Sequence, residues 1–121
     1  MILVDTSIWV QHFREGEPEL IQLLDRGRVL GHPFVVGELA LGNLPDRTTV
    51  LHWLERLPQA LVARHDEVFQ FIIAERLAGE GIGYVDACLL AATRLTPEAL
   101  FWTRDRRLNA LALGMGVAFP T

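Results

Sequence analysis

The sequence contains no lysine, because every one of its 11 basic residues is an arginine. Codon bias in a GC-rich genome is enough to explain the preference. The absence of lysine still excludes some classes of function. Phosphate binding by a P-loop requires a lysine, so that mode is excluded. Dehalogenase-like phosphatases and receiver domains also combine clustered aspartates with a lysine, and the sequence disfavours both.

Cysteine and long hydrophobic runs are also scarce. The single cysteine, Cys88, cannot form an internal disulfide, which is typical of a reducing cytoplasm. The apolar runs are far shorter than the roughly 20 residues of a membrane-spanning helix. No basic segment precedes the first apolar run, and Asp5 interrupts that run, so we expect no signal peptide. We therefore expect a cytoplasmic protein with no membrane segment.

Size and charge bound the interpretation further. A chain of 121 residues predicts one domain, 1–121, with one sizeable core. Half of the residues are hydrophobic, which favours a partner that covers some apolar surface. The net charge of −4 argues against nonspecific binding to nucleic acid. Two divalent cations bound at acidic residues would cancel this charge.

Predicted strands and helices alternate along the chain. Strands are expected at 2–5, 28–30, 60–63, 99–102 and 117–119. Helices are expected at 6–14, 18–26, 33–42, 46–57, 66–78 and 85–95, with a last helix that ends near 113. Capping residues are expected at Thr6 or Ser7, Asp46 and Asp66. This alternation predicts the α/β class: a three-layer α/β/α sandwich around a mostly parallel sheet.

Four carboxylates lie within or directly after apolar sequence: Asp5, Glu38, Asp86 and Asp105. A carboxylate in apolar surroundings is costly to bury unless something compensates its charge. Asp5 and Asp105 follow predicted strands, and the carboxyl ends of parallel strands form the functional edge of such sheets. Asp86 falls in the first turn of a predicted helix, where the helix dipole favours an anion. We therefore expect the four acids to meet at one edge and to share a divalent metal.

Such a cluster matches a particular chemistry. Two divalent ions can activate water and stabilise the leaving oxygen when a phosphodiester is hydrolysed. Magnesium prefers hard oxygen ligands, so carboxylates suffice without histidine or cysteine. The neighbouring hydroxyls of Thr6, Ser7 and Thr103 are predicted to hold the carboxylates in place. For any one acid, a helix cap or a surface charge is the alternative.

Other polar residues have weaker interpretations. Arg104, Arg106 and Arg107 flank Asp105 and are candidate phosphate contacts, or else part of a solvated helix face. Trp9 and Phe13 are four residues apart on one predicted helix, which favours packing over base stacking. The four histidines lack the spacing of a zinc motif, so surface or capping roles are expected. They are His12, His32, His52 and His65.

Four segments together resemble the PIN domain, and in particular the VapC-type toxins of toxin–antitoxin pairs. They are Val4-Asp5-Thr6-Ser7-Ile8-Trp9, Glu38 within an apolar helix, Gly83-Tyr84-Val85-Asp86-Ala87 and Trp102-Thr103-Arg104-Asp105. The resemblance covers residues 2–119. It implies a metal-dependent endoribonuclease with a PIN-like fold and with Mg²⁺, or Mn²⁺ in its place, as cofactor. The four acids would form its catalytic and metal-binding cluster, supported by Thr103. It also implies an RNA substrate, a homodimer and a small cognate antitoxin.

Two other interpretations remain at this point. The first is a PIN-like module for protein interaction without nuclease activity, although such a module is expected to have lost an acid and this chain has all four. The second is a phosphatase with Asp5 as nucleophile. That chemistry usually needs a second aspartate two residues later, where this chain has Ser7.

Overall fold

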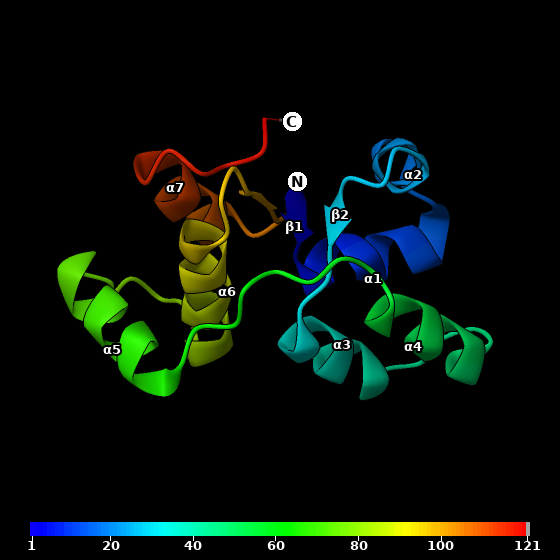
Figure 1. Cartoon of the computed structure of the whole chain (residues 1–121), viewed down its shortest axis with the longest axis horizontal. Coiled ribbons are helices and arrows are strands. Elements are labelled where there is room, and N and C mark those ends of the chain that lie inside the picture. Colours follow the sequence, from blue (N-terminus) through cyan, green and yellow to red (C-terminus); the bar gives the residue numbers. More distant parts are fainter. Residues whose placement is uncertain (121) are drawn as a thin grey trace.

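The computed structural model describes residues 1–120 and forms an α/β fold around a three-stranded parallel sheet, as the alternation predicted (Figure 1). The strands are β1 (Ile2–Val4), β2 (Val29–Leu30) and β3 (Leu100–Trp102) in the order β2-β1-β3. The helices are α1 (Thr6–Glu15), α2 (Pro18–Asp25), α3 (Pro33–Ala40), α4 (Arg47–Glu55), α5 (His65–Ala74), α6 (Tyr84–Leu95) and α7 (Arg106–Gly114).

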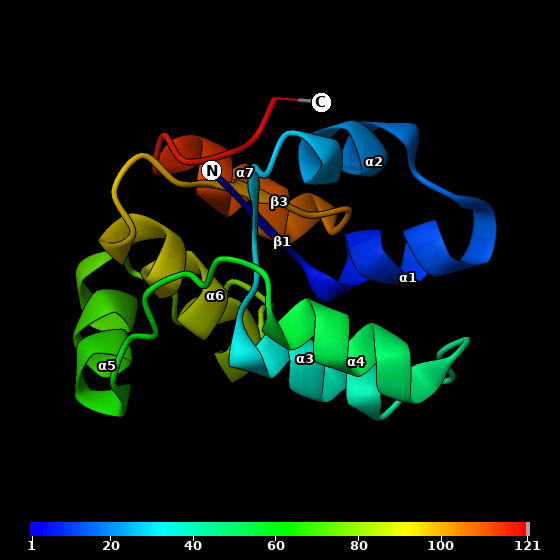
Figure 2. The same ribbon diagram turned by 45° about the vertical axis from the view of Figure 1, so that its right-hand side comes forward.

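Helices lie on both sides of the sheet. In Figure 1, α5, α6 and α7 lie to one side of β1, and α1 to α4 lie to the other. Figure 2 shows α3 and α4 packed side by side, and shows both chain ends at the same end of the molecule. The expectation of a three-layer α/β/α fold is therefore confirmed.

The central strand explains why the sheet forms with so few residues. All three residues of β1 are buried, and each faces a partner in β3, from the Ile2–Leu100 pair to the Val4–Trp102 pair. A strand covered by helices on both faces needs a continuous apolar run, which Ile2-Leu3-Val4 provides. Helix α6 covers one of these faces, and its residues 87–93 are all buried.

Two expected strands are wrong. The segment predicted as a strand at 60–63 forms none; the nearest pairing is one parallel bridge just before it, between Gly31 and Gln59. The segment leaves the sheet because the Leu61 N–H donates to Thr96 Oγ1 at 2.9 Å instead of to a neighbouring strand. The segment predicted at 117–119 forms one bridge, between Phe101 and Ala118. Pro120 follows it and has no N–H with which to extend the ladder.

Helix starts also differ from the expectation. The capping position of α1 is Asp5 instead of Thr6 or Ser7, and that of α5 is Arg64 instead of Asp66. At α5 the Arg64 N–H donates to Glu67 Oε1 at 2.8 Å, so the acid that caps lies one residue later than expected. Asp46 does occupy the capping position of α4, as predicted.

The packing role predicted for Trp9 is confirmed. Its side chain is 1% exposed, stacks on Phe13 at a ring-centroid distance of 6.0 Å and meets Trp53 edge-on at 6.0 Å. No helix within residues 1–120 is both long enough and apolar enough to cross a membrane.

His32 is completely buried and caps α3, the helix that carries Glu38. Its Nδ1 accepts the Phe34 N–H at 3.0 Å, so the proton of the neutral ring lies on Nε2. Nε2 has no hydrogen-bond partner among the described residues. Burial lowers the pKa of His32 from 6.5 to about 4, because a charged ring is disfavoured without water.

This burial predicts how stability depends on pH. Because the folded pKa lies below the unfolded one, the unfolded state binds more protons between pH 6.5 and 4. The free energy of unfolding is therefore unaffected by His32 above pH 7, and falls by about 2 kcal/mol between pH 7 and 5. Urea titrations should show this loss. His32→Asn retains a capping acceptor and should remove most of the pH dependence; an equal loss in both proteins would contradict the assignment.

Candidate active site

The deepest of the four acids is Asp5, directly after β1. It is 7% exposed, and its Oδ2 accepts hydrogen bonds from the hydroxyls of Ser7 and Thr103, each at 2.7 Å. No side chain within residues 1–120 donates to its Oδ1. A buried carboxylate needs such donors to offset lost hydration. Asp5 is therefore fixed through one oxygen, and the other receives no side-chain donor within residues 1–120.

The hydroxyls of Ser7 and Thr103 also join two strand ends. Ser7 Oγ accepts the Arg104 N–H at 3.1 Å, and Thr103 Oγ1 accepts the Asp105 N–H at 3.1 Å. The turn after β1 is thus tied to the turn after β3. The supporting roles predicted for Ser7 and Thr103 have a direct geometric basis in these contacts.

Glu38 and Asp105 are both exposed to solvent, but each is oriented by a hydrogen bond. Glu38 Oε1 accepts the Thr6 hydroxyl at 2.6 Å, which links α3 to the first turn of α1. Asp105 is the N-cap of α7, and its Oδ1 accepts the Leu108 N–H at 3.0 Å. Asp105 therefore does cap a helix, which was the alternative considered for any one acid. It does so through Oδ1 only, and Oδ2 takes no part in the cap.

Asp86 lies in the first turn of α6, half-buried, and its Oδ2 accepts the Gly83 N–H at 3.1 Å. Burial raises the pKa of Asp86. The hydrogen bond from Gly83 acts in the opposite direction, and the negative charges of Asp5, Asp105 and Glu38 raise the pKa further. The negative charges of Asp5, Asp105 and Glu38 therefore all lie close enough to Asp86 to act on it. That the four acids form one metal site stays a prediction.

The carboxylates do not converge into a compact cage. Within residues 1–120, no three His, Cys, Asp or Glu side chains come together closely enough to hold a metal ion. Each of the four acids instead accepts a hydrogen bond from an N–H or a hydroxyl of the chain. The donor set nevertheless fits a hard divalent cation, because it consists of carboxylate and hydroxyl oxygens with one oxygen of Asp5 unengaged.

The three candidate arginines do not act as one group. Arg104 and Arg106 line a polar cavity between α2 and the turn after β3. Arg107 lies on another side, against Gly81. A Cβ atom added to Gly81 would collide with Nη1 of Arg107. Gly81 has a φ of +79°, so the loop before α6 passes close to Arg107 only with glycine there.

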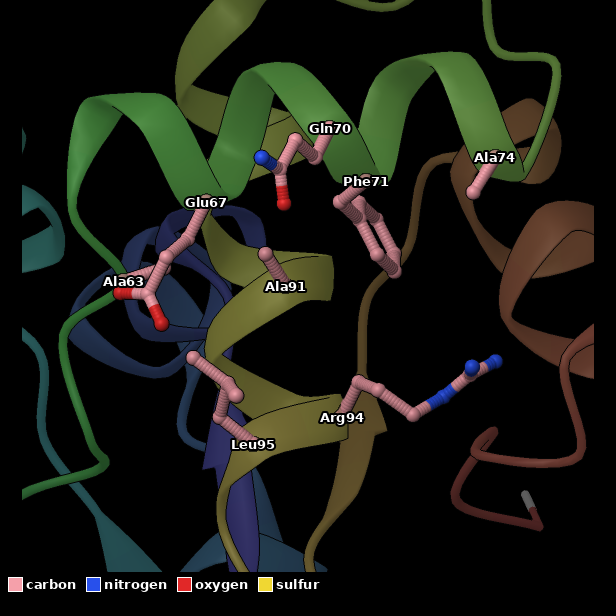
Figure 3. A pocket seen from close by; sticks show the side chains of 8 residues that line it. All are labelled: Ala63, Glu67, Gln70, Phe71, Ala74, Ala91, Arg94 and Leu95. Atoms are coloured by element: carbon pink, nitrogen blue, oxygen red, sulfur yellow. The ribbon is translucent and has the colours of Figure 1, made fainter.

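A separate cavity of about 290 Å³ lies between α5 and α6 (Figure 3). It contains none of the four acids. Its Arg94 pairs with Glu75 at 3.2 Å and lies over the ring of Phe71. This pairing neutralises the cavity's cation, so the carboxylate edge of the sheet remains the candidate active site.

The fold and this acidic edge define a PIN domain, and the PIN domain family matches residues 2–113 of the chain. The chain belongs to that family. Ribonuclease VapC32 of Mycobacterium tuberculosis is 46% identical over 118 residues, covering 98% of this chain and 95% of the relative. Ribonuclease VapC11 of M. tuberculosis and VapC ribonuclease Mb1587 of Mycobacterium bovis are each 31% identical, covering 93% of this chain and 92% of theirs. The resemblance to VapC-type PIN domains is thereby confirmed.

Sequence reasoning did not identify Glu17 or Asn109, which line the cavity beside the site. Neither residue lies in a recognisable motif. Nothing in the sequence around Glu17 or Asn109 indicates that α2 and α7 bring the two side chains together. A glutamate before a proline would ordinarily be assigned to a helix start.

Thr103 provides a test of this geometry. Thr103→Val removes the donor to Asp5 Oδ2 and leaves the Asp105 N–H without its acceptor, in a side chain that is 7% exposed. We expect the free energy of unfolding to fall by about 1–3 kcal/mol, measured by urea denaturation. Thr103→Ser keeps the hydroxyl and should lose clearly less. Equal losses would show that packing, not the hydrogen bonds, matters at this position.

Proposed function

We propose that this protein is an endoribonuclease, the toxin of a toxin–antitoxin pair, that cleaves RNA at the edge formed by Asp5, Glu38, Asp86 and Asp105. The observation that carries the proposal is that Asp5 and Asp105 directly follow neighbouring parallel strands, while the charges of Asp5, Asp105 and Glu38 all act on Asp86. The ribonucleases among its relatives, which cover nearly the whole chain, support the same activity.

The four acids would hold Mg²⁺, for which Mn²⁺ can substitute. Two such ions, when bound, supply an activated water and stabilise the leaving oxygen of the phosphodiester. The chain's own residues orient the ligands: Ser7 and Thr103 hold Asp5, and Thr6 holds Glu38. Asp86 contributes an anion whose charge is disfavoured by burial and by its neighbours, and a cation would relieve that cost.

The activity is tested with purified protein freed of any partner. It should cut RNA from a broad panel with Mg²⁺ present, and EDTA should stop cleavage. Asp86→Asn should abolish cleavage with the fold intact, whereas Asp25→Asn, a charge-matched change on α2, should retain it. Intact RNA across the panel in the presence of metal would rule out the enzyme.

A second readout does not depend on activity. Mg²⁺ at about 100 times its dissociation constant should stabilise the wild type by roughly 2.7 kcal/mol against unfolding. The Asp5→Asn and Asp86→Asn variants should gain clearly less. An equal gain in the wild type and both variants would place the ions elsewhere.

We also propose a homodimer. Apolar side chains remain exposed on α5 and in the segment before it, with Phe69 57%, Ile73 65%, Leu61 54% and Val62 49% exposed. The apolar face of α4 packs inward through Leu54, which is 2% exposed. The exposed apolar area on and before α5 therefore favours a second copy as its cover.

Sedimentation at micromolar concentration should report about twice 13.6 kDa. Phe69→Glu should shift the mass to that of one chain, because a charge would be buried at the interface. Leu113→Glu changes a similarly exposed residue on α7 and should leave the dimer intact. A monomeric wild type would refute the dimer.

The proposed antitoxin is a small protein whose carboxy-terminal segment carries an arginine or lysine to the four acids. A cavity of about 310 Å³ between α1 and α3 supports this, because Val10, Phe13 and Leu39 give it apolar walls and Glu38 lies among its lining residues. An apolar side chain in this cavity would place a neighbouring cation beside Glu38. Such a cation would pair with the carboxylates and compete with metal, so inhibition and metal loss would be coupled.

Co-expression with the upstream gene product tests this partner. Changing its basic residues to alanine should restore cleavage, and Val10→Glu in this chain should weaken the complex by placing a charge in the cavity. Inhibition that survives every basic change, with equal metal occupancy in the free and bound states, would show that the antitoxin acts by steric cover.

A further inference from the structure

A polar cavity of about 390 Å³ adjoins the carboxylate site. Its polar walls come from three parts of the chain: the start of α2, the turn after β3, and the first turn of α7. The lining side chains with polar groups are Glu17, Glu19, Thr103, Arg104, Arg106 and Asn109. The volume lies in the range of small-molecule binding sites.

The cavity and the carboxylate site share one wall. Thr103 lines the cavity, and its hydroxyl donates to Asp5 Oδ2 at 2.7 Å. Arg104 lines the cavity too, and its backbone N–H donates to Ser7 Oγ at 3.1 Å. A strand of RNA with its scissile phosphate at Asp5 would therefore have the adjacent nucleotide beside the cavity.

The charges of the lining select the kind of group that fits. Two carboxylates oppose two guanidinium groups, so a phosphate alone would be attracted by Arg104 and Arg106 but repelled by Glu17 and Glu19. The pair between Arg104 Nη1 and Glu17 Oε2 is long, at 3.9 Å, so both groups retain hydrogen-bonding capacity. A ligand with donors on one edge and acceptors on another satisfies both signs of charge.

Ile8 and Trp102 also line the cavity, but they are 1% and 6% exposed, so they contribute little apolar surface to it. A flat ring in the cavity would be held mainly by the polar groups at its edges. Carboxylates and guanidinium groups around one cavity are the environment of a nucleobase read by its edges.

We infer that this cavity binds the base of a nucleotide next to the cleaved phosphodiester and that it prefers guanine. Guanine presents adjacent N–H donors that a carboxylate such as Glu17 accepts, and adjacent O6 and N7 acceptors to which an arginine donates. The other bases lack one of these two paired edges. The inference rests on the proposed ribonuclease function and adds its sequence preference.

Binding of mononucleotides tests the cavity without requiring cleavage. GMP, AMP, CMP and UMP are titrated into the inactive Asp86→Asn protein by calorimetry, with amide and side-chain NMR signals to locate each. GMP should bind at least about ten-fold more tightly than the others, and should shift the signals of Arg104, Arg106 and Asn109. Equal binding of all four, or shifts confined to other surfaces, would overturn the inference.

Two variants separate recognition from folding. Glu17→Gln replaces a two-oxygen acceptor with a group that also donates, so the preference for GMP should fall about ten-fold. Asn109→Ala removes an amide from the same wall and should weaken GMP binding with little effect on thermal stability. Asp25→Asn on α2, outside the cavity, should keep the preference; an equal fall in Asp25→Asn would overturn the inference.

Cut-site mapping distinguishes this inference from the proposed function. Wild-type protein with Mg²⁺ is incubated with random-sequence RNA, and the new ends are sequenced. Enrichment of guanine at one fixed position, lost in Glu17→Gln, is expected. Cleavage without that enrichment would overturn the cavity assignment alone, whereas GMP binding without any cleavage would overturn the ribonuclease and leave the guanine site standing.

Discussion

The buried carboxylate of Asp5 is the constraint on which the rest of the site depends. At 7% exposure, it would be costly without donors, and both donors to its Oδ2 are hydroxyls that follow parallel strands, one in the first turn of α1 and one in the turn after β3. Ser7 belongs to the chain just after β1, and Thr103 to the chain just after β3. Because each hydroxyl also accepts an N–H from the β3–α7 turn, satisfying one buried charge positions Asp105 as well.

Each of the other three acids is held by its own hydrogen bond, and the three acids share no donor. Asp86 and Asp105 each accept an N–H in the first turn of their own helix, and Glu38 accepts a hydroxyl from α1. The fold therefore does not need a cation to complete its hydrogen bonds. A cation drawn to the site would have to compete with these local donors, and the disfavoured charge of Asp86 supplies part of the driving force.

The sequence was sufficient to predict the alternating architecture and the placement of Asp5 and Asp105 directly after neighbouring strands, because parallel strands oblige their carboxyl ends to meet. It was insufficient where tertiary contacts decide. The strand expected at 60–63 failed because Thr96, 35 residues from Leu61, accepts its N–H. The burial of His32 and the separation of Arg107 from Arg104 likewise depend on packing between distant elements, which no local pattern records.

If the proposed antitoxin and the inferred base bind as argued, inhibition and substrate selection use different cavities beside the site. The apolar cavity that includes Glu38 lies between α1 and α3, and the polar cavity that includes Thr103 lies between α2 and α7; no residue lines both. An inhibitor that enters the first cavity would reach the carboxylates without imitating a base in the second. Changes at Glu17 would then alter which RNA is cut without altering which antitoxin binds, and changes at Val10 would do the reverse. The first cavity includes Glu38, and the second includes Thr103, which donates to Asp5, so either occupant would lie beside the same group of charges.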